Sequence, residues 1–278
     1  SDLHFTPTPR AGMVRLRIDG RLAPYLSLPK AAFERLVGLL ANEGSVRDLV
    51  TTREALFPPP ADLAGRYGFR VQLTQTVRGV AAVIRVLDRQ SPVVEFDSLG
   101  FDPESARQLR RWASTAEGMV LVTGPTGSGK TTTLFALMRL VDGLRCSVHA
   151  VENPVELHCS QWHQSQVQAV GGVTEAEAFR TYAKGFLRSD PDVCLVGELR
   201  DLPAVDAAID LAGTGHLVYA TVHANGAPQT LQRLRHLGVS SEAVSAVLTG
   251  VLAQRLVPRL CPQCREPGSD ADTAEALR

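Results

Sequence analysis

Gly124-Pro-Thr-Gly-Ser-Gly-Lys-Thr131 is the stretch that decides the fold of this chain, because it fits the phosphate-binding pattern G-x-x-x-x-G-K-[ST]. Residues 119–123 before it form a short apolar run of β-prone residues, as expected for a buried strand. Residues 131–140 after it have the apolar spacing of a helix. A chance glycine-rich turn would not be expected between a strand and a helix, so we predict a nucleoside triphosphate-binding loop.

The residue types of this loop explain how it would bind phosphate. Gly127 and Gly129 let backbone N–H groups turn inward around an anion, and the following helix points its positive dipole end at the same place. Lys130 can reach the β and γ phosphates, and the Thr131 hydroxyl can bind Mg²⁺. The candidate nucleotide contacts of the loop are Gly124, Pro125, Thr126, Gly127, Ser128, Gly129, Lys130, Thr131 and Thr132.

Composition excludes several classes of protein. There are 29 Lys and Arg residues and 29 Asp and Glu residues, so the formal net charge is zero. The chain therefore lacks the excess positive charge that is typical of a general nucleic-acid-binding protein. No apolar run approaches the ~18 residues of a membrane span, and the N-terminus is not a signal peptide. We therefore expect a cytosolic chain whose membrane association is peripheral, through partners. The abrupt ends indicate a segment excised from a longer protein.

The chain divides by pattern into an α+β domain at 1–91, a linker at 92–104 and an α/β domain at 105–278. In the first domain, alternating residues predict strands at 13–20, 21–26, 67–74 and 80–87, with a helix at 31–42. The second domain alternates strands and helices, which predicts a parallel sheet with crossover helices. Its predicted strands are 119–123, 147–151, 193–197 and 217–222, and its predicted helices are 104–115, 130–142, 174–188, 202–213, 228–236 and 240–255.

Two acids follow predicted strands. Asp192-Val-Cys-Leu-Val-Gly-Glu198 places Glu198 at a strand end, where it could hold Mg²⁺ through water or orient the attacking water. The alternative is a surface Glu that begins a helix. Glu152 also ends a strand, and Pro154 forces a turn after it. By itself this second pattern leaves a catalytic acid and a solvated loop charge equally open.

Histidines, arginines and cysteines supply weaker signals. His216 precedes a strand and His223 ends it, so either could contact the γ-phosphate or be purely structural. Arg66, Arg70, Arg78 and Arg85 indicate either a solvated sheet face or arginines donated to a neighbouring subunit's phosphates. Cys261-Pro-Gln-Cys264 has the spacing of half a zinc site, with no second pair in the last 14 residues. Zinc is thus expected only in a longer native chain.

Together these strings resemble the signature motifs of secretion ATPases of the type II secretion and type IV pilus class. The four motifs occur in order across most of the chain: 124–134, 151–156, 190–201 and 214–223. Residues 1–4 and 17–20 also resemble the start of that family's PAS-like domain. The resemblance implies a PAS-like N-terminal domain, a RecA-like P-loop ATPase domain, and a homohexameric ring with ATP between subunits.

The resemblance also implies roles for individual residues. Lys130 and Thr131 would take the phosphate and Mg²⁺, Glu152 would polarise water, and Glu198 would be the atypical Walker B acid. His216 and His223 match the family's histidine motif, and Arg70 and Arg85 best match the small-domain arginines that reach ATP. One departure is Asn153, where the family usually has Asp. This change removes a charge near the site, and a lower rate is expected.

The function implied is an ATP-hydrolysing motor at the cytoplasmic face of the bacterial inner membrane. Its partners would be the inner-membrane platform and cytoplasmic-side components of a secretion or pilus system. Direct binding of nucleic acid is not expected. Residues 252–264 resemble the assembly and secretion members of the family. The alternatives are a pilus retraction or conjugation-type traffic ATPase and, in another class, a nucleotide-gated binding module with little turnover.

Overall fold

The computed structural model describes residues 2–18, 21–43, 52–57, 63, 66–88, 94–167, 173–257, 260 and 263–265. Two compact units emerge from the packing of the chain. The N-terminal unit comprises residues 1–94 and 151–168, and the C-terminal unit comprises residues 95–150 and 169–278. This division assigns 151–168 to the N-terminal unit, whereas the sequence pattern placed it in the second domain. The boundaries at 91/92 and 104/105 stay predictions.

The N-terminal unit is built on an antiparallel sheet of order β3-β2-β1-β6-β5-β4. Its elements are β1 (Asp2–Pro7), β2 (Ala11–Ile18), β3 (Arg21–Pro29), α1 (Lys30–Glu43), β4 (Thr52–Phe57), β5 (Tyr67–Thr76) and β6 (Gly79–Asp88). The predicted strand pairs and helix are present, while β1 and β4 were not identified as strands from the sequence. β1 is short and only partly alternating, but it lies between β2 and β6 and completes the sheet.

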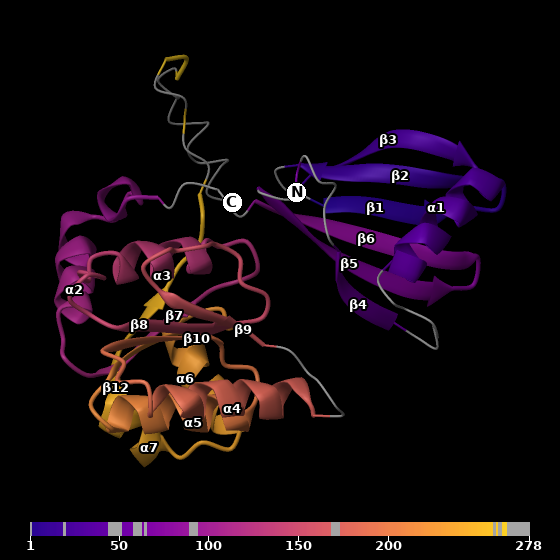
Figure 1. Ribbon diagram of the computed structural model, residues 1–278. Helices are drawn as coiled ribbons and strands as arrows, with labels where there is room; N and C mark the ends of the chain where they lie inside the picture. The colour runs from indigo at the N-terminus through magenta and orange to yellow at the C-terminus, as the bar shows by residue number, and fades with distance from the viewer. Residues whose placement is uncertain are drawn as a thin grey trace. The chain divides into compact units, whose positions relative to one another are not determined.

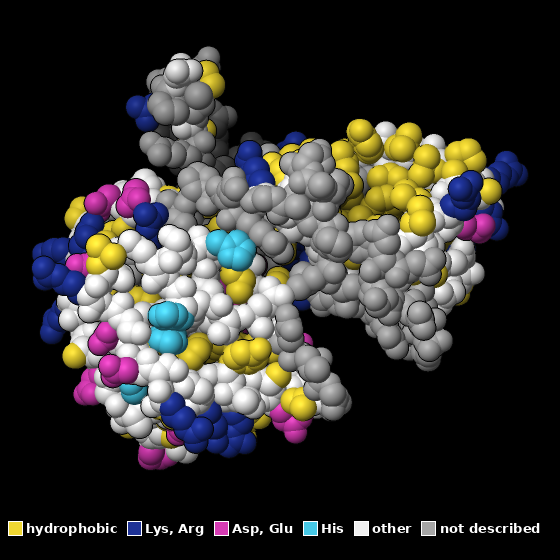
Figure 2. Space-filling view, in the orientation of Figure 1, with side chains coloured by type: hydrophobic (Ala, Val, Ile, Leu, Met, Phe, Trp, Pro, Cys, Tyr) yellow, Lys and Arg dark blue, Asp and Glu magenta, His cyan; other side chains and the backbone are white. Residues whose placement is uncertain are grey.

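Helix α1 closes one face of this sheet and forms the unit's core (Figure 1). Phe33 is almost fully buried, and its ring lies where a side chain on Gly12 of β2 would stand. The buried core residues are Phe5, Val14, Phe33, Val37, Ala41, Val71, Leu73 and Ala82. Strand β3 is at the sheet edge, and Figure 2 shows a broad hydrophobic area over this part of the unit. Exposed large hydrophobic residues of β2 and β3 are Met13, Ile18, Tyr25 and Leu26.

The second sheet has the order β12-β7-β11-β10-β8-β9, and its pairs β12·β7, β7·β11 and β11·β10 are parallel. Its strands are β7 (Gly118–Thr123), β8 (Val148–Glu152), β9 (His163–Gln166), β10 (Val193–Glu198), β11 (Leu217–Val222) and β12 (Leu248–Ala253). Strands β7, β8 and β11 are buried along their whole length. The predicted α/β fold with a parallel sheet is confirmed, and the run of buried residues explains why these strands read as continuous apolar stretches.

Helices flank this sheet, with α3 on one side and α4 and α5 on the other (Figure 1). Their bounds are η1 (Phe96–Ser98), α2 (Pro103–Ala113), α3 (Lys130–Met138), α4 (Glu175–Phe186), α5 (Leu202–Gly213), α6 (Ala227–His236) and α7 (Ser241–Val247). Side-chain caps begin several of them. Asp102 accepts from the amides of Glu104 and Ser105, and Thr174 forms a reciprocal capping box with Glu177.

The predicted helix 240–255 is wrong in its second half. Helix α7 ends at Val247, and residues 248–253 form β12 at the free edge of β7. Apolar residues in this stretch fit both a helical and an extended pattern, and short apolar runs do not distinguish the two. Pairing with β7 decides the outcome, and Gly250 lets the strand pass Trp112, whose ring would lie 2.2 Å from an added Cβ.

Candidate nucleotide-binding site

The phosphate loop lies between the buried strand β7 and helix α3. Gly124, Gly127 and Gly129 have φ values of 153°, 78° and 83°, in the region that favours glycine. An added Cβ on Gly124 would stand 2.4 Å from the Gln254 carbonyl oxygen and 2.5 Å from Ser128 Oγ. At Gly127 no described atom lies within 4 Å of that position, so its glycine is required by conformation alone. The loop therefore has the compact backbone that its sequence predicts.

Lys130 begins α3 and turns its side chain back over the loop. Its Nζ donates to the carbonyl oxygens of Gly124 at 3.0 Å and Pro125 at 3.1 Å, and lies 3.4 Å from His223 Nδ1. The lysine is buried, yet its ammonium group is held by neutral acceptors of the loop. An ammonium ion at this position is available to bind phosphate once an anion enters.

Glu198 and His223 meet at the carboxyl ends of the neighbouring parallel strands β10 and β11. His223 Nε2 lies 3.2 Å from Glu198 Oε1, and Arg200 Nε donates to Glu198 Oε2 at 2.8 Å. Arg200 also lies 3.6 Å from Glu175 of α4. Since the ammonium of Lys130 can only donate, we assign Nδ1 of His223 as the acceptor and Nε2–H as the donor to Glu198. A continuous polar chain thus runs from Lys130 through His223 to Glu198.

Two local features fix the ends of these strands. The pairing of β10 with β11 changes register between Val196 and Glu198. At this point Thr221 Oγ1 donates to the Gly197 carbonyl oxygen at 2.7 Å. Thr123 Oγ1 donates to the carbonyl oxygen of Val222 and accepts from the Ala224 amide at 3.1 Å, which fixes the backbone on both sides of His223. Sequence reasoning missed Thr123 and Arg200. Their proximity to the loop and to Glu198 in the sequence was the available signal.

Glu152 ends β8 and is buried, at 6% exposed. Burial raises the pKa of its carboxyl group to about 7, with a smaller raising effect from the charge of Glu156. Gln164 Nε2 donates to Glu152 Oε1 at 3.3 Å and opposes this shift. Gln164 is itself fixed by its bond to the Leu157 carbonyl oxygen at 2.7 Å. The carboxyl group therefore keeps its proton to a higher pH than an exposed glutamate does.

His216 lies away from the loop. It precedes β11, whose first residue Leu217 pairs with Gly118, at the opposite end of β7 from the phosphate loop. Six strand residues at about 3.3 Å each separate the two ends by about 20 Å. Nδ1 of His216 lies 2.8 Å from the Leu211 carbonyl oxygen and 3.1 Å from Thr214 Oγ1. Within this unit, His216 contacts the end of α5 and not the predicted nucleotide site.

Arg70 and Arg85 are paired in register on β5 and β6 of the N-terminal unit. Arg85 Nε donates to Asp2 Oδ1 at 2.9 Å, and the arginine side chain is half-exposed. Asp2 is in register with Arg17 on its other side. Alternation along the strands brings these three arginines and Asp2 to one face of the sheet. Arg66 instead pairs with Asp88 at 3.0 Å.

Only one of the two cysteines of the predicted half zinc site lies in the described part of the chain. Cys261 lies outside the described residues, and Cys264 is an exposed free thiol. The described residues contain no group of three or more His, Cys, Asp or Glu side chains that could hold a metal ion. Within the described chain, no helix combines the length and apolar character needed to cross a membrane. The half zinc site stays a prediction.

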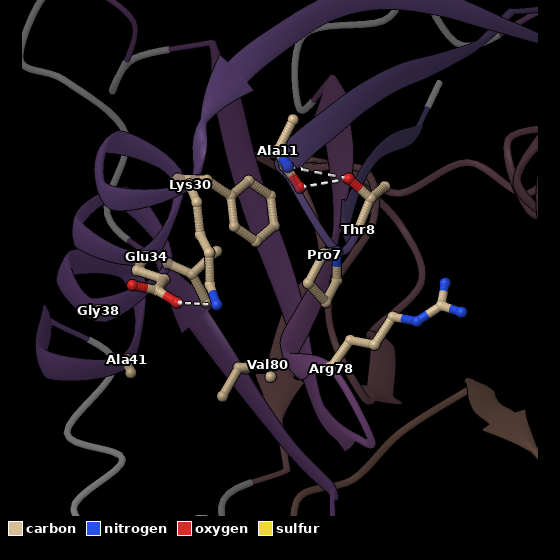
Figure 3. A pocket seen from close by; sticks show the side chains of 12 residues that line it. Pro7, Thr8, Ala11, Lys30, Glu34, Gly38, Ala41, Arg78 and Val80 are labelled. Atoms are coloured by element: carbon tan, nitrogen blue, oxygen red, sulfur yellow. Dashed lines mark hydrogen bonds and ion pairs between the residues drawn. The ribbon is translucent and has the colours of Figure 1, made fainter.

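The N-terminal unit also contains a pocket of about 320 Å³ beside α1 (Figure 3). Phe33, Val37 and Val80 make part of its apolar lining. Lys30 and Glu34 form an ion pair at 3.9 Å, and Thr8 Oγ1 donates to the Ala11 carbonyl oxygen at 2.6 Å. Of the four candidate arginines, Arg78 lines this pocket, whereas Arg70, Arg85 and the candidate residues of the phosphate loop do not.

Comparison with known proteins assigns the family. The type IV pilus assembly ATPase PilB of Thermus thermophilus is 38% identical over 283 residues, covering 100% of this chain and 31% of that protein. The type II secretion system protein E of Klebsiella pneumoniae is 37% identical, covering 100% of this chain and 55% of that protein. The chain thus spans about a third to a half of the length of these relatives.

Solved structures of related ATPases have a similar fold. The crystal structure of the pilus retraction motor PilT with bound ADP has a TM-score of 0.67 and 29% sequence identity, covering 93% of this chain and 75% of that one. The structure of the Legionella pneumophila ATPase DotB, at 22% identity and a TM-score of 0.71, supports the fold alone. The model of the family described as type II/IV secretion system protein matches residues 1–278, and the chain therefore belongs to that family.

Proposed function

We propose that this chain is the ATP-hydrolysing part of a motor for type IV pilus assembly or type II secretion. Residues 105–278 would be its RecA-like ATPase domain and residues 1–91 its PAS-like domain. The single observation that carries the proposal is the polar chain from Lys130 through His223 to Glu198. It joins the phosphate loop after β7 to an acid at the end of β10, with β11 between these two strands, and its members lie 3.4 Å and 3.2 Å apart.

The loop fits a triphosphate. Ser128 Oγ is buried without a hydrogen-bond partner among the described residues, and at Gly127 the position of a Cβ is open, which leaves room for close approach of an anion. Phosphate oxygens would replace the loop carbonyls as acceptors for Lys130 Nζ. The dipole of α3 favours negative charge at the same end. Lys130 and the loop amides then bind the charge that develops during phosphoryl transfer.

Magnesium fits this site as an ion held partly by the nucleotide. Thr131 would supply a hydroxyl ligand, and Glu198 would act through water because both of its oxygens already contact His223 and Arg200. Mg²⁺ in such sites commonly keeps several waters and uses substrate phosphates as ligands. The ion would neutralise phosphate charge.

The carboxyl groups of Glu198 and Glu152 would have different roles in hydrolysis. Glu198 holds His223, which can sense the charge on the phosphate facing Lys130. We assign Glu152 the role of polarising the attacking water, as the resemblance of 151–156 to the family's motif implies. A pKa of about 7 would also let its carboxyl group accept a proton from that water near neutral pH. Asn153 beside it carries no charge, so a slower rate is expected than with Asp at this position.

The assembly we propose is a homohexameric ring with ATP between subunits. Arg70 and Arg85 would reach the phosphates of a neighbouring subunit, in keeping with the half-exposed side chain of Arg85. The ring would act at the cytoplasmic face of the bacterial inner membrane, on a platform that moves pilin-like subunits. Assembly or secretion is favoured over retraction because PilB and secretion protein E are 37–38% identical and the retraction motor PilT is 29% identical.

The test is steady-state phosphate release from ATP by the intact protein and by Glu198→Gln. We expect the wild type to release phosphate at least about tenfold faster, because the variant weakens the metal and histidine contacts. Glu242→Gln on the exposed start of α7 provides a matched control that keeps wild-type activity. A wild type that binds ATP but turns over no faster than Glu198→Gln would refute the motor and favour a nucleotide-gated binding module.

A further inference from the structure

Gln254 follows β12 directly and contacts both ends of the phosphate loop. Its backbone N–H donates to the Thr123 carbonyl oxygen at 3.0 Å, and its Nε2 donates to the Ser128 carbonyl oxygen at 2.6 Å. Its own carbonyl oxygen lies 2.4 Å from the position of a Cβ on Gly124. One residue therefore touches the loop where it begins and where it ends.

These two hydrogen bonds orient two peptide groups. In a trans peptide the C=O bond and the N–H of the next residue point in opposite directions. Because the oxygens of Thr123 and Ser128 point to Gln254, the N–H groups of Gly124 and Gly129 point away from it. Backbone N–H groups are the part of a phosphate loop that binds the anion. Gln254 thus sets the direction of amide groups that it does not touch.

The glycines make such an external support necessary. Gly124 and Gly129 both have positive φ and no side chain to restrict their peptide planes. An added Cβ on Gly129 would lie 3.2 Å from Gln254 Nε2, so the glutamine is packed against the loop. Reversing the side-chain amide would place Oε1 against the Ser128 oxygen, two acceptors facing each other. The bond from Nε2 is therefore specific to this orientation.

We propose that Gln254 is a positioning residue for the nucleotide phosphates, acting through the loop amides. The inference rests on the proposed function, because it concerns the same phosphate site. The strand β12 would then have two roles, because it extends the sheet and also brings Gln254 to the phosphate loop. It also places a determinant of the loop more than a hundred residues from its motif.

The experiment compares Gln254→Met with the wild-type intact protein. Methionine keeps the length of the side chain and removes its donor. Gln232→Met, on the exposed surface of α6, is the matched control. We expect the Kd for ADP and the KM for ATP to rise about tenfold with Gln254→Met, which corresponds to about 1.4 kcal/mol. The kcat should fall less than about threefold, because the loop holds the phosphates in the ground state as well as the transition state.

Amide hydrogen exchange of the nucleotide-free protein supplies a second readout. Exchange at 124–129 should be faster in Gln254→Met, with the thermal unfolding midpoint and the remaining amides unchanged. Gln254→Asn, whose amide is one methylene too short to reach Ser128, should lose the same affinity. It keeps the test available if the methionine variant does not fold.

The outcomes separate the two proposals. If the wild type neither binds ADP nor releases phosphate from ATP, the proposed function fails. If the wild type binds and both Gln254 variants bind equally well, the proposed function stands and the role of Gln254 is overturned. A general rise in exchange with a lower unfolding midpoint would show a merely structural contact and would also overturn it.

Discussion

Replacing Glu152 by Gln should stabilise the protein at pH 8 and leave its stability nearly unchanged at pH 4. The carboxyl group of Glu152 is buried, and burial raises its pKa from 4.5 to about 7. Between these two pH values the folded chain keeps the proton that the unfolded chain has lost. Wild-type free energy of unfolding therefore falls as pH rises through this window. Glutamine is neutral throughout and avoids the loss.

The expected size follows from the shift. From 4.5 to about 7, at 1.36 kcal/mol per unit, the full effect is about 3 kcal/mol. The linkage relation then gives an advantage for Glu152→Gln of about 1 kcal/mol at pH 5, about 2 at pH 6 and about 3 at pH 7 to 8. The hydrogen bond from Gln164 can persist, because the glutamine side chain keeps an oxygen acceptor.

Urea unfolding followed by circular dichroism at pH 4, 5, 6, 7 and 8 measures this dependence. Glu117→Gln, an exposed change in the C-terminal unit, serves as the control and should show no trend with pH. Glu156→Gln should lower the pKa of Glu152 and reduce the wild-type loss at high pH slightly, because the charge of Glu156 raises that pKa. A stability difference for Glu152→Gln that is constant with pH, or negative at pH 8, would refute the reasoning.

Three further predictions follow from the site and its support. The kcat should rise as the pH increases through about 7, because Glu152 must lose its proton before it can act as a base. Steady-state rates at pH 5.5 to 8.5 measure this dependence. A kcat that does not change with pH would show that Glu152 takes no part in the proton-transfer step. His223→Ala should lower kcat about tenfold or more with a smaller change in ATP affinity, because it removes the imidazole that links Lys130 to Glu198. Turnover and nucleotide titration measure the two effects, and an unchanged kcat, or a loss of ATP affinity as large as the loss of kcat, would contradict this. Gly250→Ala should destabilise the protein by about 1–3 kcal/mol in urea unfolding, because the new methyl group would meet the Trp112 ring; Gly38→Ala, which meets no described atom within 4 Å, is the control and should not destabilise.

The sequence was informative where the local pattern and the buried environment agree. Strand β7, the phosphate loop and α3 were predicted from consecutive residues, because a fully buried parallel strand reads as an apolar run and the loop needs its glycines. Glu198 was found in the same way, at the end of an apolar strand. The division of 151–168 from the rest of the second half was not foreseen, because contacts between distant segments leave no local pattern.

The residues that support the loop could not be found in this way. Gln254 lies in a stretch predicted to be helical, and only the pairing of β12 with β7 brings it to Thr123 and Ser128. His216 and His223 were equal candidates from one motif. They lie at opposite ends of β11, and the parallel register with β7 decides that His223 is the one beside Lys130.

The sequence by itself determined that the chain has a phosphate loop, a parallel sheet and an acid at a strand end, because glycine, lysine and apolar runs act over a few neighbouring residues. Only the tertiary structure decided which distant side chains meet at the loop and how far the carboxyl group of Glu152 is buried. Strand order selects His223 and Gln254, and burial raises the pKa of Glu152 to about 7. Both depend on atoms far away in the chain, and the free energy of a buried charge depends on all of its surroundings at once.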